Sequence, residues 1–141
     1  MQIQYFTIEY DSKSYEYKTL EKSYVEGLFL YNELNKLFAK LLSFIKLEDI
    51  KNLSFSDIYY LLSQVDSEQV TLLLMRIISG VEYKNDDSRF VQLDDVGINE
   101  HLKCKWDLIY LVAYEVIKIN NFLKWDGIQS LLINIMNPKK P

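Results

Sequence analysis

A period-two pattern of side chains runs from Gln2 to Tyr17. Aromatic and β-branched residues, which favour strands, stand on both sides of the polar stretch DSKS. The pattern predicts an N-terminal β-hairpin over residues 1–18. Because an isolated two-stranded hairpin is only marginally stable in water, it must pack on helices or join the sheet of a neighbour.

The next segment carries apolar residues at alternating steps of four and three, as on one face of a helix. These residues are Leu30, Leu34, Leu37, Leu41 and Phe44. The spacing predicts a helix over Leu20 to Ile45. Ser23 and Glu26 form an S-x-x-E capping box near its start, and Thr19 is an alternative start one turn earlier.

Two shorter helices are predicted in the middle of the chain. In the stretch NLSFSDIYYLLSQV, Ser54 is a candidate cap, with Asp57 three residues later. In the stretch DSEQVTLLLMRIISG, Asp66 or Ser67 is a candidate cap, and Gly80 is a stop signal.

The helical periodicity weakens between Val81 and Leu102. This stretch mixes acidic pairs, Asn, Gly and isolated apolar residues. It predicts a long loop, with a short strand or turn around Phe90 to Leu93. A structureless loop longer than about 15 residues is usually functional or disordered. The loop is therefore a candidate for ordering when a partner binds.

A long helix is predicted over Lys103 to Lys124. Between Trp106 and Ile119 only Asp107, Glu115 and Lys118 interrupt its apolar surface, and a helix that is apolar on most sides is usually central or at an interface. A D-x-x-Q start signal follows at Asp126. We expect a break there, then a short last helix.

The end of the chain carries a stop signal at Asn137-Pro138. The residues beyond it, 137–141, are predicted to form a flexible tail. At 141 residues, with 49% hydrophobic and 26% charged residues, the chain fits one folded domain. The predicted fold is α+β and mainly α-helical. The hairpin is followed by about five helices, which form a helical body over residues 19–136.

Charge and cysteine content narrow the classes of partner. The formal net charge is −4, so the chain lacks the basic footprint that binding to nucleic acid requires. Cys104 has no second cysteine with which to form an internal disulfide, and MQIQYFTIEY has no signal-peptide pattern. No apolar run approaches the roughly 20 residues of a membrane span. We expect a cytoplasmic protein with neither a nucleic-acid nor a membrane partner.

No motif for catalysis or cofactor binding is recognisable. His101 and Cys104 lie three positions apart, but a structural zinc site needs four such ligands, and the chain has one of each type. We interpret them as an exposed His beside a partly buried Cys. The acidic pairs lack calcium-loop spacing, and the isolated glycines form no phosphate-binding loop. The sequence therefore predicts a protein that is not an enzyme and has no metal and no cofactor.

Aromatic residues are the candidates for a protein-binding surface. They include Tyr59, Tyr60, Trp106, Tyr110, Tyr114, Phe122 and Trp125. At helical spacing most such rings are core, and we expect this for Trp106 and Tyr110. Trp125 lies beside the predicted break and is the better surface candidate, although core packing is an equal alternative. The stretch NNFLKW then forms an exposed shoulder between two helices, and whether Phe122 and Trp125 point inward or outward stays open.

The order of elements resembles the tail assembly chaperones of long-tailed bacteriophages. The resemblance rests on a hairpin ending in SYEYKTL, an amphipathic helix, a helix pair ending in LLLMRIISG, an acidic loop, and a final AYEVIKINNFLKW. Members of that family are small cytoplasmic proteins. They often open with strand-turn-strand leading into a helix, and often end in a helix that reads Asn-Phe before another aromatic residue.

The resemblance implies a noncatalytic function. Such chaperones coat the hydrophobic, helical tape measure protein and recruit tail tube subunits during assembly in the host cytoplasm. Asn121, Phe122 and Trp125 match the loose terminal pattern of the family and are the partner-binding residues that the resemblance implies. Self-association through hairpin edges or helix faces is also expected. The terminal NPKKP fits a frameshift site for a longer form, because adjacent lysine codons can form a slippery run of adenines.

Two other functions remain open on the sequence. One is a small phage or bacterial regulator that inhibits a single protein by binding it, and the other is a hydrolase that uses a pair of carboxylates. Gene neighbours distinguish the first from a chaperone: a tape measure gene immediately downstream supports the chaperone, and a cluster of defence or early genes supports the regulator.

Overall fold

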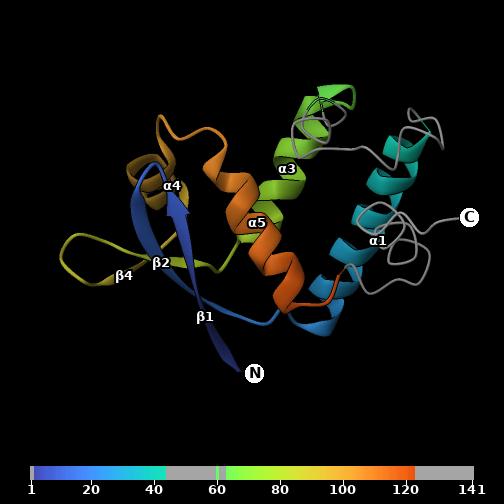
Figure 1. Cartoon of the computed structure of the whole chain (residues 1–141). Coiled ribbons are helices and arrows are strands. Elements are labelled where there is room, and N and C mark those ends of the chain that lie inside the picture. Colours follow the sequence, from blue (N-terminus) through green and yellow to red (C-terminus); the bar gives the residue numbers. More distant parts are fainter. Residues whose placement is uncertain (1, 44–59, 61–62, 123–141) are drawn as a thin grey trace, which may run out of the picture.

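The computed structural model describes residues 2–43, 60 and 63–122. Along this part of the chain, pairs of strands alternate with pairs of helices (Figure 1). In order, they are β1 (Ile3–Tyr10), β2 (Lys13–Leu20), α1 (Tyr24–Leu42), α3 (Ser67–Ile78), β3 (Glu82–Lys84), β4 (Phe90–Gln92), α4 (Asp95–Leu102) and α5 (Leu108–Ile119).

The predicted N-terminal hairpin is confirmed. β1 and β2 pair in an antiparallel register that runs without a slip from Ile3 opposite Leu20 to Tyr10 opposite Lys13. Asp11 and Ser12 form the connection, with φ of 52° and 66°. Positive φ at both central residues defines a type I′ turn, whose twist matches that of the two strands.

The prediction of a long loop between Val81 and Leu102 is wrong. β3 pairs with β2 and β4 pairs with β3, so the described strands form one antiparallel sheet in the order β1-β2-β3-β4. The short strand expected around Phe90 is found as β4. β3 and β4 have three residues each, which is too short for a period to emerge from the sequence. Pairing with β2 of the hairpin stabilises these short strands, which would not be stable alone.

α4 completes the same segment. The Asp94 side chain caps this helix by accepting a hydrogen bond from the Gly97 backbone N–H, at 2.9 Å. Gly97 is required here, because a Cβ atom would lie 2.0 Å from the carbonyl oxygen of Gln92. This close approach joins β4 to α4.

The helix signals at the starts of α1 and α3 are confirmed. The Glu26 backbone N–H donates to Ser23 Oγ at 3.4 Å, so α1 begins with the predicted cap and not at Leu20, which belongs to β2. Asp66 caps α3 by accepting from the Glu68 N–H at 3.0 Å. Gly80, with φ of 88°, follows the end of that helix.

α5 is shorter than the helix predicted over Lys103 to Lys124. Cys104 follows the end of α4 and adopts φ of 65°, a left-handed conformation that a helix interior does not tolerate, so no helix can run through it. α5 begins only at Leu108 and ends at Ile119. Asn121, just after that end, again has positive φ, at 57°.

The described residues thus form a mixed α+β fold with four helices. The expectation of about five helices after a single hairpin is corrected within this part of the chain, because strands return after α3. The helices predicted around Ser54 and after Asp126 lie almost wholly outside the described residues, as does the tail 137–141. No described helix is long and apolar enough to span a membrane.

α5 occupies the middle of the fold, between α3 and the hairpin (Figure 1). Its buried residues join the inner face of the sheet and the apolar face of α1 in one core. The most buried members include Tyr17, Leu30, Ile77, Ile78, Leu108, Val112 and Val116.

Candidate functional site

The partner-binding residues implied by the family resemblance do not form one outward surface. Phe122 is only 4% exposed and belongs to the core. Its ring lies over Gly27 of α1, where a Cβ would be 3.6 Å from Phe122 Cε1. The neighbouring Asn121 is exposed. Of the two orientations that the sequence left open for Phe122, the structure thus has the inward one. Trp125 lies outside the described residues.

The core assignment of Trp106 is also wrong. Its side chain is 78% exposed, because it precedes α5 and follows the left-handed Cys104. Tyr110, one turn inside α5, is half-buried and packs beside Val65 and Val70. The error came from extending the helical pattern through a turn.

His101 is buried, with 5% exposure, and Cys104 is exposed, which is the reverse of the expected arrangement. The His101 ring lies among three tyrosines of the sheet. It stacks on Tyr83 at 4.3 Å between ring centroids, and meets Tyr15 and Tyr17 edge to face at 5.1 and 5.4 Å. The Tyr17 hydroxyl lies 2.6 Å from His101 Nε2. β2 and β3 therefore hold the imidazole of α4 from several directions.

The buried imidazole is uncharged near neutral pH. Burial, with a smaller effect of Lys105, lowers the pKa of His101 to about 4 from its ordinary 6.5. Burial raises the pKa of the Tyr17 hydroxyl, which stays protonated and shares a hydrogen bond with the neutral imidazole. The ring is thus a hydrogen-bonded core residue, and near pH 7 it is not an imidazolium acid.

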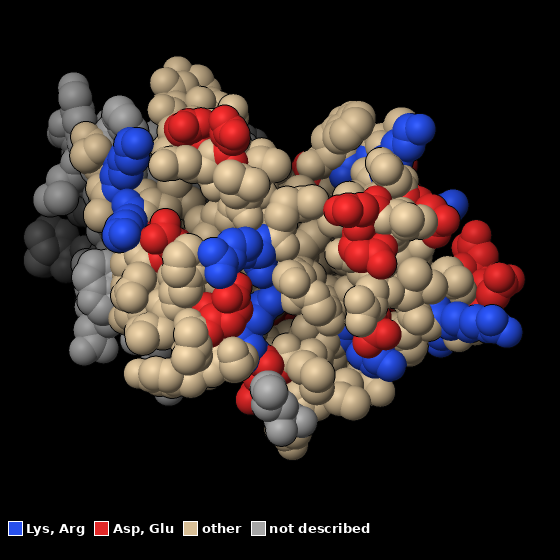
Figure 2. All heavy atoms as spheres, turned by 180° about the vertical axis from the view of Figure 1, so that it is seen from behind, with Lys and Arg blue, Asp and Glu red and all other residues tan. Residues whose placement is uncertain are grey.

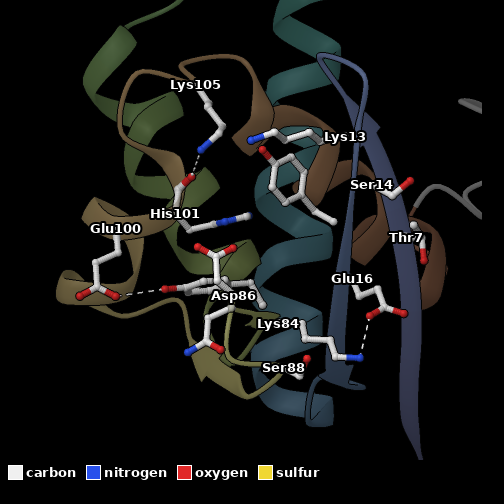
Figure 3. Close-up of a pocket in the computed structure, with 13 residues that line it drawn as sticks. Thr7, Lys13, Ser14, Glu16, Lys84, Asp86, Ser88, Glu100, His101 and Lys105 are labelled. Atoms are coloured by element: carbon white, nitrogen blue, oxygen red, sulfur yellow. Dashed lines mark hydrogen bonds and ion pairs between the residues drawn. The ribbon is translucent and has the colours of Figure 1, made fainter.

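An open pocket of about 860 Å³ lies beside His101, between β2 and the connection of β3 to β4 (Figure 3). Its charged lining residues are Lys13, Lys84, Lys105, Glu16, Asp86 and Glu100. Lys84 pairs with Glu16 at 2.9 Å, and Lys105 donates to the His101 carbonyl at 2.9 Å. Equal numbers of acidic and basic groups give the pocket no net charge with which to select an ionic ligand.

A second hollow is a groove of about 700 Å³ between α1 and α3. Phe29 and Leu37 line it from α1, and Leu72, Leu73 and Met75 line it from α3. Leu72 is 60% exposed, although the remainder of α3 buries Val70, Ile77 and Ile78 in the core. Each helix thus presents a second, apolar stripe to the groove at helical spacing.

The charges of the groove differ from those of the whole chain. Lys36, Lys40 and Arg76 line it with a single acidic residue, Glu33, although the chain carries a net charge of −4. Lys36 pairs with Glu33 at 3.3 Å. No ion pair joins Lys40 to another described residue. The groove is therefore apolar along its floor and basic at its α1 rim.

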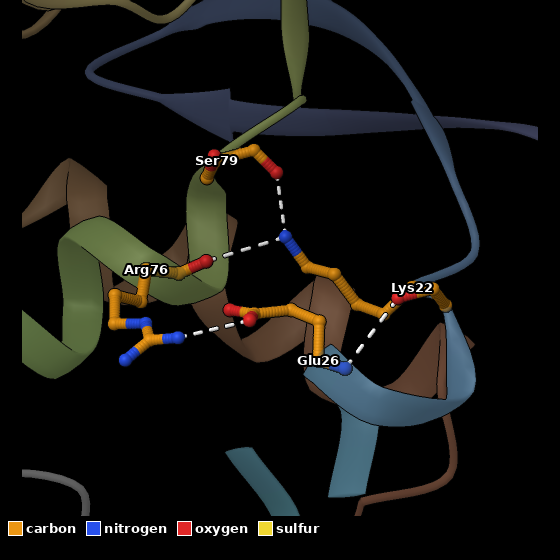
Figure 4. Close-up of polar contacts among 5 residues, drawn as sticks. Lys22, Glu26, Arg76 and Ser79 are labelled. Atoms are coloured by element: carbon orange, nitrogen blue, oxygen red, sulfur yellow. Dashed lines mark hydrogen bonds and ion pairs between the residues drawn. The ribbon is translucent and has the colours of Figure 1, made fainter. Parts of the chain in front are cut away.

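Polar contacts set the spacing of the two helices (Figure 4). Lys22, just before α1, donates from Nζ to the carbonyl oxygens of Arg76 and Ser79 at 3.2 and 2.5 Å. Arg76 pairs with Glu26 at 2.9 Å, and its guanidinium lies 3.8 Å from the centre of the Phe29 ring. The start of α1 is thereby fixed to the end of α3, and the groove begins at this joint.

The surface seen from behind the view of Figure 1 is largely uncharged (Figure 2). Lys and Arg alternate with Asp and Glu in small groups, and neither sign forms a continuous field on this face.

The sequence did not predict the groove itself. The apolar face of the helix predicted over Leu20 to Ile45 is wider than a coiled-coil seam, so it fits either a core helix or a core helix with a second contact surface. In the structure the additional apolar positions of α1 and α3 line the groove, at Phe29 and Leu72 above all.

Within the described residues, no three His, Cys, Asp or Glu side chains cluster to hold a metal ion. Comparison with known proteins identifies no relative: no family model, no curated protein and no solved structure matches this chain.

Proposed function

We propose that this protein is a noncatalytic phage tail assembly chaperone that binds an amphipathic helix of the tape measure protein in the groove between α1 and α3. The observation that carries the proposal is this groove, which combines an apolar floor with a basic rim. A helix bound in a groove places its apolar side chains on the floor and its polar side chains at the rim. The bound helix therefore has an apolar stripe with acidic residues beside it.

The family resemblance supplies the identity of the partner. The hairpin, the long first helix and the helix ending LLLMRIISG are present in the fold. The acidic loop of the resemblance is instead occupied by β3, β4 and α4, so that part gives no support. The resemblance also implies that the protein recruits tail tube subunits. The alternative function is that of a regulator that binds and inhibits a single protein.

The experiment is co-expression of the full chain with a candidate tape measure protein. The expected result is a soluble complex that elutes as one species, since the groove covers apolar helix surface that otherwise aggregates. If the solubility of the tape measure protein is unchanged and no complex elutes, the chaperone function is wrong.

Substitution in the groove tests the site itself. Leu72→Asp places a charge on the apolar floor, and we expect at least a tenfold loss of affinity, about 1.4 kcal/mol. Val96→Asp is the matched control, because Val96 is a similarly exposed apolar residue of α4, outside the groove, at 66% against 60%. Equal binding by both variants would place the interface elsewhere.

Charge reversal tests the chemistry of the bound helix. Lys40→Glu is expected to weaken binding, and Lys13→Glu, which changes the net charge equally outside the groove, is expected to leave it nearly unchanged. The difference between the two variants should shrink as salt is added. If Lys40→Glu strengthens binding, the partner is basic and the proposed pattern is wrong.

A further inference from the structure

β1 is the edge strand of the sheet, and no described strand pairs with the backbone groups of its outer edge. The strand has eight residues and pairs with β2 alone among the described strands. In an antiparallel pair, residues alternate between those bonded to the neighbour and those that direct N–H and C=O away from it. The outer edge of β1 is therefore a template for a further strand.

The hairpin turn decides which residues face outward. In a two-residue type I′ hairpin, the residues that flank the turn, Tyr10 and Lys13, form a hydrogen-bonded pair. Hydrogen-bonded pairs recur at every second residue, so the other residues of β1 that are bonded to β2 are Ile8, Phe6 and Gln4. The outward groups thus belong to Ile3, Tyr5, Thr7 and Glu9. No hydrogen bond joins these backbone groups to another described residue outside the sheet.

This edge lacks the features that usually prevent association. The sequence IQYFTIEY contains no proline and no lysine, and the register with β2 has no bulge. Glu9 is its one charged residue. Ile3 and Tyr5 are 50% and 66% exposed, which is unusual for large apolar side chains at an open edge.

We propose that two copies of this chain associate through β1, in an antiparallel arrangement with a two-fold axis at Phe6. The two sheets then form one continuous sheet across the dimer. In this register Tyr5 of one copy lies opposite Thr7 of the other, and Ile3 lies opposite Glu9. It is the register in which all the outward residues from Ile3 to Glu9 find a partner.

The strand is complementary to itself in three respects. First, the outward N–H and C=O groups of each copy lie opposite the outward C=O and N–H groups of the other copy. The half-buried Phe6 meets its own copy in a non-hydrogen-bonded pair, where side chains approach most closely. The two Glu9 side chains lie at opposite ends, separated by roughly 20 Å along the strands, a distance at which salt screens their repulsion. These features favour a second copy over an unrelated extended peptide.

The mass of the purified full chain in solution tests the proposal. We expect twice the 16.8 kDa of one chain, measured by light scattering over a dilution series. Thr7→Pro removes an outward N–H without removing a bond to β2, and is expected to give a monomer with unchanged helix and sheet content. Thr7→Val keeps the N–H and is the matched control, which should remain a dimer.

Thr7→Lys is a second variant that leaves the backbone unchanged and places a cation at the edge of each copy. It is also expected to give a monomer. A wild-type protein that is monomeric throughout the dilution series, or a dimer that survives both Thr7→Pro and Thr7→Lys, would overturn the proposal.

Disulfide cross-linking tests the register, in chains that also carry Cys104→Ser. Tyr5→Cys chains mixed with Thr7→Cys chains should cross-link on oxidation, because paired residues have Cα atoms about 5.5 Å apart, within disulfide range. Tyr5→Cys chains alone should not, since their cysteines are offset along the strands. Cross-linking by the single variant and not by the mixture would overturn this register.

The outcome is separable from that of the proposed chaperone function. The groove lies between α1 and α3, whereas the proposed dimer uses β1. The monomeric Thr7→Pro chain should therefore bind the tape measure protein through its groove as the wild-type protein does.

Discussion

The hydroxyl of Tyr17 on β2 lies 2.6 Å from Nε2 of His101 on α4, and the two residues are 84 positions apart in the chain. Both side chains are buried, at 0% and 5% exposure. The hydrogen bond ties the hairpin to a helix that follows the last described strand. Because a buried polar group without a partner is costly, each residue depends on the other.

The first prediction concerns pH. The pKa of His101 is about 4 in the folded chain, against an ordinary 6.5, so between these values the unfolded chain binds the extra proton. The free energy of unfolding contributed by His101 is thus fully present above pH 6.5 and is lost as the pH falls toward 4, by about 1–3 kcal/mol.

Chemical denaturation at a series of pH values checks this prediction. His101→Gln is the control, because its amide can still form a hydrogen bond with Tyr17 but does not titrate. The carboxylates titrate in both proteins, so the difference between them reports His101 alone. The difference in unfolding free energy between the wild type and this variant should change across the window from pH 6.5 to 4. A difference that is constant with pH would contradict the neutral buried imidazole.

A second prediction isolates the hydrogen bond itself. Tyr17→Phe keeps the ring but leaves His101 Nε2 without its hydrogen-bond partner in a buried site, which should cost about 1–3 kcal/mol of unfolding free energy. Tyr5→Phe removes a hydroxyl from a ring that is 66% exposed on the same sheet, and should change stability by less than about 0.5 kcal/mol. Equal effects of the two variants would show that the bond contributes nothing.

The junction of β4 and α4 gives a third prediction. Gly97→Ala places a methyl group 2.0 Å from the Gln92 carbonyl oxygen, so the backbone must move, and we expect a loss of about 1–3 kcal/mol or more. Gly27→Ala is the control, because its nearest contact is an ordinary 3.6 Å to Phe122. In α1 the added methyl should stabilise the helix by up to about 1 kcal/mol. Denaturation midpoints of both variants measure the contrast.

The joint between α1 and α3 gives a fourth prediction. Burial lowers the pKa of Lys22, and its Nζ satisfies two carbonyl oxygens at the end of α3. Lys22→Met retains most of the aliphatic stem and should destabilise the protein by about 1–2 kcal/mol. Lys84→Met removes only a partly exposed ion pair with Glu16 and should cost less than about 0.5 kcal/mol. Thermal unfolding of both variants tests the difference, and equal losses would contradict a specific role for Lys22.

Local signals predicted those parts of the fold that local chemistry controls. The hairpin followed from alternation, and the starts of α1 and α3 followed from Ser23 and Asp66, whose side chains bond to backbone groups two or three residues away. Such contacts involve near neighbours in the chain, and the sequence displays both partners together.

The errors fall where a distant segment decides the outcome. The short β3 and β4 are strands because β3 pairs with β2 and β4 pairs with β3. The pattern between Val81 and Leu102 cannot reveal that β2 lies beside this segment. His101 is buried because Tyr15, Tyr17 and Tyr83 surround it from other elements.

The candidate site shows the same division. Periodicity predicted that α1 and α3 are amphipathic, and it did not show that they leave an apolar groove between them. Phe122 faces inward because it packs in the core against α1, a segment far from it in the sequence.

The sequence by itself thus determined the hairpin, the caps and the apolar faces, since each depends on residues close together in the chain. Only the tertiary structure decided the full sheet, the buried imidazole, the groove and the open edge of β1. Each of these depends on which distant surfaces meet and which remain uncovered, and that is a property of the packed chain.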